Sequence, residues 1–335
     1  MALLVTGGAG YIGSHTCVKL LSAGYKVVVL DNFCNASARV FERMEQITGR
    51  RPALYQADLL DTRALDELFC REEIEAVLHF AALKSAADSI KRPFAYYQTN
   101  VAGTLNLCRA MARRGVKNMV FSSSAAVYGS PKKTPVPEDE PLFPQTPYGK
   151  SKLVAEQMLL DFHRADPGWN AVLLRYFNPI GAHESGLIGE SPKLALGNLM
   201  PELLSAALGK SGGAVICGGD YPTKDGTGVR DFVHVEDIAA GHLLALRKLS
   251  ENPGVTAYNL GSGYGTSVLE VLRGLERACG RRIPYHIAPR RACDVDICYA
   301  DIEKARRELH YRPQKTLSAM CKDAWRFASE NPDGI

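Results

Sequence analysis

The sequence predicts an α/β protein with a Rossmann-type, doubly wound parallel sheet and a smaller, mixed C-terminal domain. Three observations lead to this prediction: a glycine-rich turn directly after an apolar N-terminal run, alternating strand and helix signals through the first half, and an irregular second half richer in Gly and Pro. Alternation of this kind is typical of parallel sheets covered by helices on both faces. The 335 residues, 46% of them hydrophobic, suffice for one large or two smaller domains.

The beginning of the chain reads as strand, glycine-rich turn, helix and strand. Ala2–Thr6 is an apolar run, Gly7-Gly8-Ala9-Gly10-Tyr11-Ile12-Gly13 follows at once, and Lys26–Leu30 ends in Asp31. This order predicts a dinucleotide-binding unit, in which Gly7 allows a tight turn, Gly10 lets the backbone approach a pyrophosphate, and Gly13 permits close helix packing. Free N–H groups at the helix start would hold the phosphates.

Asp31 indicates which dinucleotide the unit prefers. A carboxylate at the end of the second strand accepts hydrogen bonds from the adenosine ribose hydroxyls and repels a 2′-phosphate, so NAD is favoured over NADP. The competing interpretation is a glycine-rich βα turn that binds no nucleotide, with Asp31 as a capping residue.

Further strand and helix signals alternate up to about residue 178. We expect strands at Ala53–Gln56, Ala76–Ala81, Asn118–Ser123 and Ala171–Phe177, separated by helices near Asp61–Arg71, Pro93–Arg114 and Tyr148–Arg164. Ligands of such sheets gather outside the carboxyl ends of the strands. The segments expected along this edge are Gly7–Gly13, Asp31, Asp58, Ala81–Lys84, Ser122–Ser124 and Phe177–Asn178.

Composition excludes several classes of protein. The net charge of +4 is small, and no Lys/Arg block interleaves with aromatic residues, so nucleic-acid binding has no support. No stretch approaches the length of a membrane span. The nine cysteines include no CxxC pair and no Cys/His cluster, so we expect no metal site and reduced thiols. The chain also runs directly into a strand without a signal segment, and we therefore expect a cytoplasmic protein.

Tyr148 and Lys152 are spaced four residues apart at the start of an expected helix, which places both side chains on one face. An ammonium beside a phenol lowers the pKa of the tyrosine. At ~4 Å and an effective dielectric near 20 the attraction is roughly 4 kcal/mol, about three pKa units. Such a tyrosine could act as a base near neutral pH. Because the spacing alone is common, its significance depends on the dinucleotide motif.

Together with Ser124, these motifs resemble the extended short-chain dehydrogenase/reductase superfamily and, within it, the UDP-glucose/UDP-galactose 4-epimerase family over nearly the whole chain. The segments that carry the resemblance are Thr6–Thr16, Asp31–Asn35, Phe80–Lys84, Phe121–Ser124, Arg175–Pro179, Asp220–Asp231 and Ala288–Arg291. The resemblance implies inversion of carbon 4 of a UDP-hexose through a transient 4-keto sugar, with NAD bound. Tyr148 would take the proton of the 4-hydroxyl, Lys152 would hold the phenolate and the nicotinamide ribose, and Ser124 would hydrogen-bond the reacting oxygen.

The resemblance also assigns binding positions. For the cofactor these are Gly7, Gly10, Tyr11, Ile12, Gly13, Asp31, Asn32, Phe33, Cys34, Asn35, Ala36, Asp58, Leu59, Phe80, Ala81, Ala82, Leu83, Lys84, Thr99, Ser124, Tyr148, Lys152 and Phe177. For the UDP-sugar they are Ser124, Tyr148, Asn178, Asn198, Leu199, Arg230, Phe232, Arg291, Asp294 and Cys298. The two arginines fit a diphosphate because a guanidinium binds it bidentately.

Each assignment has a structural alternative. Ser124 could cap the end of a strand, Lys152 could be a solvated helix charge, Asp58 could form a turn, and the arginines could form surface ion pairs. The chain also departs from the family pattern, with Ala82 in place of a glycine, Thr99 of an asparagine and Phe232 of a tyrosine.

Cys298 bears on substrate choice. Some members of the family have a bulky tyrosine here against the hexose, whereas others have a small residue. Our hypothesis is that Cys298 leaves room for a 2-acetamido group, so that UDP-N-acetylglucosamine and UDP-N-acetylgalactosamine also interconvert. The alternative is that neighbouring loops close this space.

Three other functions compete. A 4,6-dehydratase needs an Asp-Glu acid/base pair after the Ser/Thr-rich strand, where this chain has Ala125-Ala126. An epimerase of UDP-glucuronate would need another cationic group facing the sugar carboxylate, and sequence leaves this open. The third is an NAD-binding sensor without catalysis, which an intact Ser124, Tyr148 and Lys152 set disfavours.

The sequence also indicates two domains and a homodimer. We assign residues 1–178 to an NAD-binding domain, with later segments near 233–262 returning to it, and residues 179–335 to a UDP-sugar-binding domain. Helices equivalent to Pro93–Arg114 and Tyr148–Arg164 form the intersubunit bundle in the resembling family, so we expect a homodimer.

Overall fold

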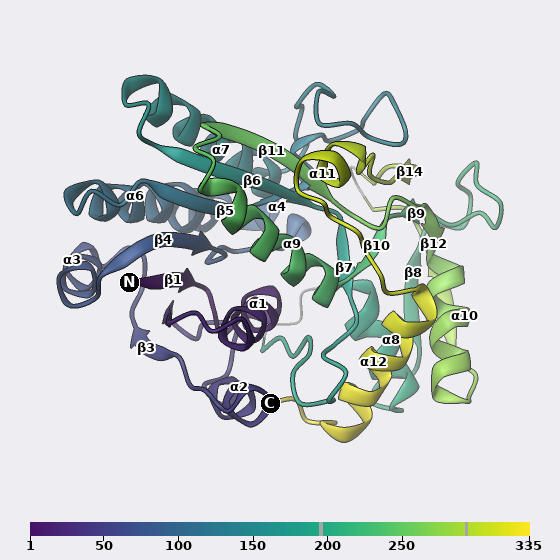
Figure 1. Ribbon diagram of the computed structural model, residues 1–335. Helices are drawn as coiled ribbons and strands as arrows, with labels where there is room; N and C mark the ends of the chain where they lie inside the picture. The colour runs from purple at the N-terminus through teal and green to yellow at the C-terminus, as the bar shows by residue number, and fades with distance from the viewer. Residues whose placement is uncertain (194–196, 292–293) are drawn as a thin grey trace.

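A computed structural model describes residues 1–193, 197–291 and 294–335 (Figure 1). Its centre is a seven-stranded sheet in the order β11-β6-β5-β4-β1-β2-β3, with every neighbouring pair parallel. The strands are β1 Ala2–Thr6, β2 Val27–Asp31, β3 Ala53–Gln56, β4 Ile74–His79, β5 Asn118–Ser124, β6 Asn170–Tyr176 and β11 Val255–Leu260. The predicted Rossmann-type sheet is confirmed.

The central strands are apolar because both faces of the sheet are covered. Every residue of β1, β2 and β6 is buried, as expected for inner strands of a parallel sheet. Alternate residues of β1 enter different cores: Leu3 and Val5 face one, and Ala2 and Leu4 face the other. β3 lies at the sheet edge and is largely exposed.

Helices form a layer on each side of the sheet. Residues of α1, α2 and α9 join the core on the Leu3 side, and residues of α3, α6 and α7 join the core on the Ala2 side. Their bounds are α1 Tyr11–Ser22, α2 Arg39–Thr48, α9 Val235–Leu249, α3 Thr62–Arg71, α6 Gly103–Arg113 and α7 Pro147–Ala165. α9 packs along α1, and β11 pairs with β6, so both elements extend the N-terminal layer structure although they follow residue 178.

The single helix predicted over Pro93–Arg114 is interrupted. After α4 (Ala86–Lys91), the chain forms α5 (Pro93–Tyr96), a π-helical segment η1 (Tyr97–Ala102) and then α6. The sequence analysis missed this π segment, which contains Asn100. The buried Asn100 amide accepts from the Leu83 N–H, donates to the Leu83 carbonyl, and also donates to Ser151 Oγ. π segments of this kind frequently occur at functional sites.

The second half of the chain adds small sheets and a separate core. β7 pairs with β10, β8 with β13, and β9 lies between β12 and β14. These strands are β7 Asn178–Ile180, β8 Ala214–Cys217, β9 Val229–Arg230, β10 Phe232–His234, β12 Thr266–Ser267, β13 Tyr285–Ala288 and β14 Ile297–Cys298. The helices are α8 Leu199–Ala207, α10 Val268–Cys279, α11 Glu303–Glu308 and α12 Leu317–Glu330, and a 3₁₀ turn covers Ala125–Val127. In the described part of the chain, no helix combines the length and apolar character needed to cross a membrane.

Candidate active site

A cavity of about 510 Å³ opens at the carboxyl edge of the sheet. It is lined by segments from both halves of the chain, including the glycine-rich turn and the ends of β2, β4, β5 and β6. All the strand-end segments predicted to meet at this edge contribute to its wall. Of the individually predicted site residues, only Phe33 and Cys298 do not line it.

The glycine-rich turn has the shape that a dinucleotide requires. Gly7 adopts φ +71°, and a Cβ there would lie 2.6 Å from the Ala81 backbone nitrogen. A Cβ on Gly13 would overlap the Gly7 carbonyl oxygen. Gly10 is the N-cap of α1, and no side chain caps that helix end. The first N–H groups of α1 are therefore available to an anionic ligand in the cavity, and the residues present fit a bound dinucleotide.

Asp31 is held in place by the backbone at the other end of the glycine-rich unit. Its Oδ2 accepts a hydrogen bond from the Ala9 N–H at 3.0 Å, and its Oδ1 accepts one from the Phe33 N–H at 2.9 Å. Burial raises the pKa of this carboxyl, while the two backbone bonds lower it. Carboxylate oxygens can accept more than one bond, so Asp31 retains acceptor capacity toward ribose hydroxyls.

Tyr148 and Ser124 both line the cavity and contact each other. Tyr148 lies in the first turn of α7, whose N-cap Thr146 accepts from the Gly149 N–H at 3.2 Å. Burial raises the pKa of the Tyr148 phenol, and a hydrogen bond with Ser124 lowers it. Ser124 ends β5 and also caps the following turn, because its Oγ accepts from the Ala126 N–H. The capping role and a place in the site therefore coexist in Ser124.

The predicted effect of Lys152 on the phenol is not observed. Lys152 is only 5% exposed, which excludes a solvated helix charge. Its Nζ donates to the Ser122 carbonyl at 2.7 Å, and burial lowers the pKa of the amine to about 7. The pKa of Tyr148 is raised rather than lowered. Coulomb attraction at an effective dielectric near 20 favours the charged pair, but desolvation of both groups dominates at this position.

A buried ion pair supports this part of α7. Glu156, one turn beyond Lys152, accepts bonds from Arg175 Nε at 3.0 Å and Nη2 at 2.7 Å, and from Ser123 Oγ at 2.5 Å. The Glu156 charge also raises the pKa of Lys152 against the effect of burial. Arg175 stands on β6 and Ser123 on β5, so the network joins α7 to the strands that carry the site.

Tyr176 and His242 support the cavity wall, although the sequence analysis assigned neither of them. Tyr176 lines the cavity, and its hydroxyl is 2.5 Å from His242 Nε2. His242 Nδ1 lies 2.9 Å from the Ile238 carbonyl, which assigns the proton to Nδ1 and makes Nε2 the acceptor for Tyr176. The His242 ring is 4.6 Å from the Phe80 ring. Burial lowers the pKa of His242 to about 4, so the imidazole that contacts Tyr176 is uncharged at neutral pH.

The two predicted diphosphate ligands, Arg230 and Arg291, also line the cavity. Arg230 Nη2 donates to Asp294 Oδ1 at 2.8 Å, and Arg291 donates from Nε to Cys217 Sγ at 3.2 Å and from Nη2 to the Gly197 carbonyl. Arg230 therefore both forms an ion pair and lines the cavity. Asp58 likewise lines the cavity and forms a turn, since its Oδ1 accepts from the Leu60 N–H.

The structure places two assigned side chains outside the cavity wall. Phe33 packs edge-on against Phe41, with ring centroids 6.1 Å apart, although its neighbours Asn32 and Cys34 line the cavity. Cys298 is buried in a cluster with Val127, Tyr128, Val136, Phe177, Ala300 and Ile302. Neither side chain therefore lines the cavity, and each packs against neighbouring apolar or aromatic side chains.

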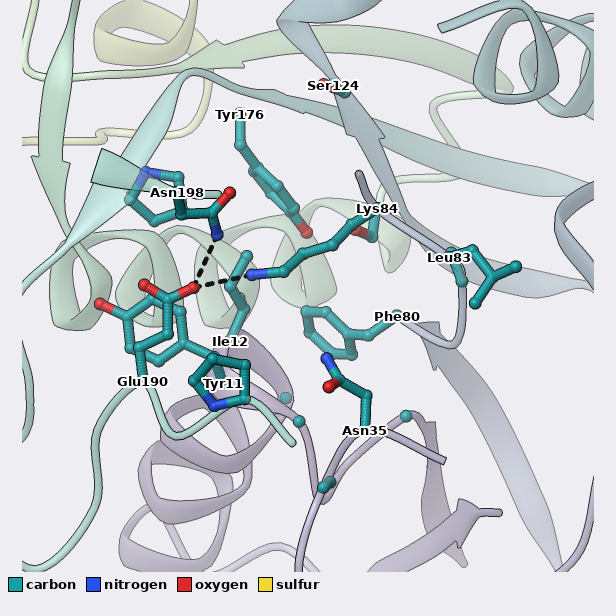
Figure 2. Close-up of a pocket in the computed structure, with 18 of the residues that line it drawn as sticks. Tyr11, Ile12, Asn35, Phe80, Leu83, Lys84, Ser124, Tyr176, Glu190 and Asn198 are labelled. Carbon is teal, nitrogen blue, oxygen red and sulfur yellow. Dashed lines mark hydrogen bonds and ion pairs between the residues drawn. The ribbon is translucent and has the colours of Figure 1, made fainter. Parts of the chain in front are cut away.

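Other lining residues were missed because no local motif marks them. They include Tyr176, Glu190, Cys217 and Tyr221. Tyr176 is the last residue of β6 and adjoins the predicted Phe177, so the strand-end rule could have identified it. Glu190 lies in an irregular connection, where position along the chain gives no indication of spatial neighbours. Figure 2 shows it beside Lys84 and Asn198 in the cavity.

Comparison with known proteins agrees with this geometry. A profile of the NAD dependent epimerase/dehydratase family matches residues 3–261. This chain belongs to that family. It is 53% identical over 334 residues to a UDP-glucose 4-epimerase of Bacillus subtilis (strain 168), covering all of this chain and 98% of that protein.

Solved structures of family members are also similar to this chain over its whole length. A UDP-glucose 4-epimerase from Bifidobacterium longum in complex with NAD+ and UDP has a TM-score of 0.97 at 46% identity, with 100% of both chains covered. A UDP-Glc/GlcNAc 4-epimerase from Campylobacter jejuni has a TM-score of 0.85 at 37% identity, covering 98% of this chain and 99% of that one. The resemblance to the UDP-glucose 4-epimerases and the NAD cofactor predicted from the sequence are confirmed.

In this NAD-dependent epimerase/dehydratase, the buried Lys152 makes stability depend on pH. Its pKa is about 7 in the folded state, against the ordinary 10.5 when unfolded. Between these values the unfolded state binds more protons, so stability rises with pH. Below about pH 7 the full cost of the buried ammonium is present. We expect Lys152→Met to stabilise the protein most near neutral pH, and this advantage to shrink by about 2–4 kcal/mol toward pH ~9.5.

Urea unfolding of both proteins across this pH range measures the difference. Comparison with the variant removes the contributions of the thiols and phenols that titrate in the same window. A stability difference that stays constant from neutral to alkaline pH would show that Lys152 keeps its ordinary pKa in the folded protein.

Proposed function

We propose that the protein is a UDP-glucose/UDP-galactose 4-epimerase that inverts carbon 4 of the hexose through a transient 4-keto sugar. The observation that carries the proposal is that one cavity is lined by Ser124, Tyr148, the glycine-rich turn and the two arginines Arg230 and Arg291. The relatives named UDP-glucose 4-epimerase, similar over their full length, support it.

The chain's own groups account for the proton transfers. Tyr148, as phenolate, takes the proton of the sugar's 4-hydroxyl and later returns one to the same oxygen. Ser124, held by the Ala126 N–H, donates a hydrogen bond to that oxygen and stabilises its developing charge. When bound, NAD+ reversibly accepts the hydride of carbon 4, and its positive ring favours the phenolate. The cofactor residues assigned above, from Gly7 to Phe177, hold the dinucleotide in the orientation that this exchange requires.

The substrate residues would bind the nucleotide firmly and leave the hexose freedom to turn. Arg230 and Arg291 supply guanidinium groups for the diphosphate, and Asn178, Asn198 and Leu199 line the same cavity. The 4-keto sugar must present both of its faces to the nicotinamide ring in turn. The strong contacts should therefore be made with the UDP part of the substrate and not with the hexose. Phe232 and Asp294 contribute to the same wall.

We expect Tyr148→Phe to lower the turnover of UDP-galactose by about 10²- to 10⁴-fold, because the general base is removed while the ring is retained. A coupled assay of UDP-glucose formation measures the loss. Calorimetric titration with UDP controls for folding and should give a dissociation constant within about threefold of wild type. Wild-type turnover in the variant would favour a different base, and no turnover in either protein would favour the non-catalytic sensor.

Two related reactions, 4,6-dehydration and epimerisation of a UDP-uronate, have to be distinguished from the proposed one. A 4,6-dehydratase needs acid/base side chains after β5, where Ala125 and Ala126 form the 3₁₀ turn and cannot transfer protons. Product analysis with plain, N-acetylated and uronate UDP-sugars separates the remaining candidates, and a check for copurified NAD tests its retention.

We further propose that UDP-N-acetylglucosamine and UDP-N-acetylgalactosamine are accepted. Cys298 is paired in register with Arg230 and packs against Phe177, both of which line the cavity. A small side chain here lets this part of the wall stand back from the sugar. The Campylobacter jejuni relative, named as a UDP-Glc/GlcNAc 4-epimerase, supports the proposal.

Cys298→Tyr should therefore suppress the acetylated pair selectively. The surrounding cluster is buried and includes the cavity-lining Phe177, so we expect a phenol ring at this position to displace that part of the wall toward the sugar. We expect kcat/KM for UDP-N-acetylglucosamine to fall about tenfold or more, with less than a threefold change for UDP-galactose. Equal losses for both sugars, or negligible turnover of the acetylated pair by wild type, would contradict the proposal.

The arrangement of the strands and helices suggests where the boundary between the two domains lies. We propose that residues 1–178, with the segment near 233–262 returning, form the NAD-binding domain and that residues 179–335 supply the UDP-sugar domain. The positions of α9 and β11 against the first sheet support this division. We also propose a cytoplasmic location, which the eight free cysteines among the described residues support and cell fractionation tests.

A homodimer is the assembly we propose, through the helices that follow β4. Ile90, Phe94 and Tyr97 are 52%, 91% and 40% exposed on consecutive segments α4, α5 and η1. Exposed apolar side chains of this kind are typical of protein interfaces. Phe94→Glu should shift the protein toward monomer in sedimentation velocity, whereas Phe143→Glu, at a 74% exposed loop position, should not. A wild-type monomer at micromolar concentration would contradict the proposal.

A further inference from the structure

Glu190 connects the two halves of the cavity through one carboxylate oxygen. Its Oε1 lies 2.8 Å from Lys84 Nζ and 2.9 Å from Asn198 Nδ2, and its side chain is only 10% exposed. Lys84 follows β4, and Asn198 is the N-cap of α8. Figure 2 shows both nitrogens directed at this oxygen. Glu190 therefore fixes one residue assigned to the cofactor and one assigned to the substrate.

The carboxylate determines which way the Asn198 amide faces. A carboxylate can only accept hydrogen bonds, so Asn198 must present its NH₂ group to Glu190. The amide oxygen is then left as an acceptor on the other side, as Figure 2 shows. An acceptor of this kind suits a sugar hydroxyl, which donates, and does not suit a sugar carboxylate.

The same carboxylate offsets the charge of Lys84. Arg230, which also lines the cavity, is similarly paired with Asp294. A neutral hexose adds no charge to this arrangement. A hexuronate would bring a second carboxylate into a cavity that already contains Glu190, and the repulsion is strengthened by the limited exposure of Glu190 to solvent.

We propose that Glu190 is a positioning and specificity-determining residue, which orients Asn198 and Lys84 for a neutral hexose and disfavours UDP-hexuronates. The proposal rests on the UDP-hexose 4-epimerase function proposed above. It extends that function by assigning the choice between neutral and acidic sugars to a side chain outside the Ser124, Tyr148 and Lys152 set.

The test uses the NAD-loaded protein and compares Glu190→Gln with wild type. Glutamine keeps the shape and an acceptor oxygen for both Lys84 and Asn198, so only the charge is removed. The matched control is Glu72→Gln, because Glu72 lies 2.9 Å from Lys26 Nζ, accepts a bond from the Tyr55 hydroxyl, is 15% exposed and lies away from the cavity. Calorimetric titrations with UDP, UDP-glucose and UDP-glucuronate give the dissociation constants.

We expect wild type to bind UDP-glucuronate more weakly than UDP-glucose. In Glu190→Gln, the ratio of the two dissociation constants should fall by about tenfold. This is the change that one unit charge produces at about 12 Å with an effective dielectric near 20. The ratio in Glu72→Gln should equal that of wild type. An unchanged or widened ratio in Glu190→Gln overturns the specificity role.

Steady-state kinetics tests the positioning role. Glu190→Ala removes the acceptor and should raise KM for UDP-galactose about tenfold or more with a smaller effect on kcat, whereas Glu190→Gln should restore most of the affinity. An unchanged KM in Glu190→Ala overturns this role. The ratios of dissociation constants do not depend on catalysis. Failure of wild type to epimerise UDP-galactose would therefore count against the proposed function and not against the specificity role of Glu190.

Discussion

The site depends on the parallel pairing of β1 with β4 at the centre of the sheet. Thr6 at the end of β1 pairs in register with His79, and its carbonyl accepts bonds from the Phe80 and Ala81 N–H groups at 2.9 and 3.1 Å. Its hydroxyl lies 2.6 Å from His79 Nδ1. The strand order reverses direction at this pair, so the two following loops diverge and leave a crevice between them. Both loops therefore reach the cavity from one fixed point.

The close approach at this point explains the glycine after Thr6. Gly7 turns with a positive φ directly against Ala81, and any side chain there would displace the loop that carries Phe80 to Lys84. The same hydrogen-bonded layer continues from His79 Nε2 to Thr104 Oγ1 at 2.8 Å and from Thr104 to the Asn100 carbonyl. The π segment is thus anchored to the central strands, and its Asn100 amide in turn fixes Leu83. The loops that follow β1 and β4 look independent in the sequence but share this support.

How far the sequence determines this arrangement depends on the range of the interaction. Strand limits such as Ala2–Thr6 and Ala53–Gln56 follow from apolar runs and agree with the structure, because local pattern sets them. The meeting of Asp31, Ser124 and Phe177 follows from the strand-end rule once the sheet is known to be parallel. The roles of these residues come from the family resemblance, which adds information that no spacing contains.

What the sequence could not supply are long-range contacts and the cost of burial. Glu190 meets Lys84 across more than a hundred positions of chain, in a connection without regular structure. The π segment interrupts a helix whose composition gives no indication of it. The pKa of Tyr148 moved opposite to expectation because Coulomb attraction was considered without desolvation, and only the folded structure shows that both groups are buried.

Burial of Tyr148 and Lys152 has a chemical consequence. A raised pKa for the phenol and a lowered pKa for the amine both favour neutral forms, so the protein by itself resists placing charge on either group. The Glu156–Arg175 pair stands directly behind them, and the Glu156 charge partly restores the ammonium form of Lys152. A positively charged ligand ring would shift the balance further, because it stabilises the phenolate without adding a counter-ion from solvent. Under the mechanism proposed above, the phenolate would therefore form together with bound oxidised cofactor, and proton removal would be confined to complexes that can complete the reaction.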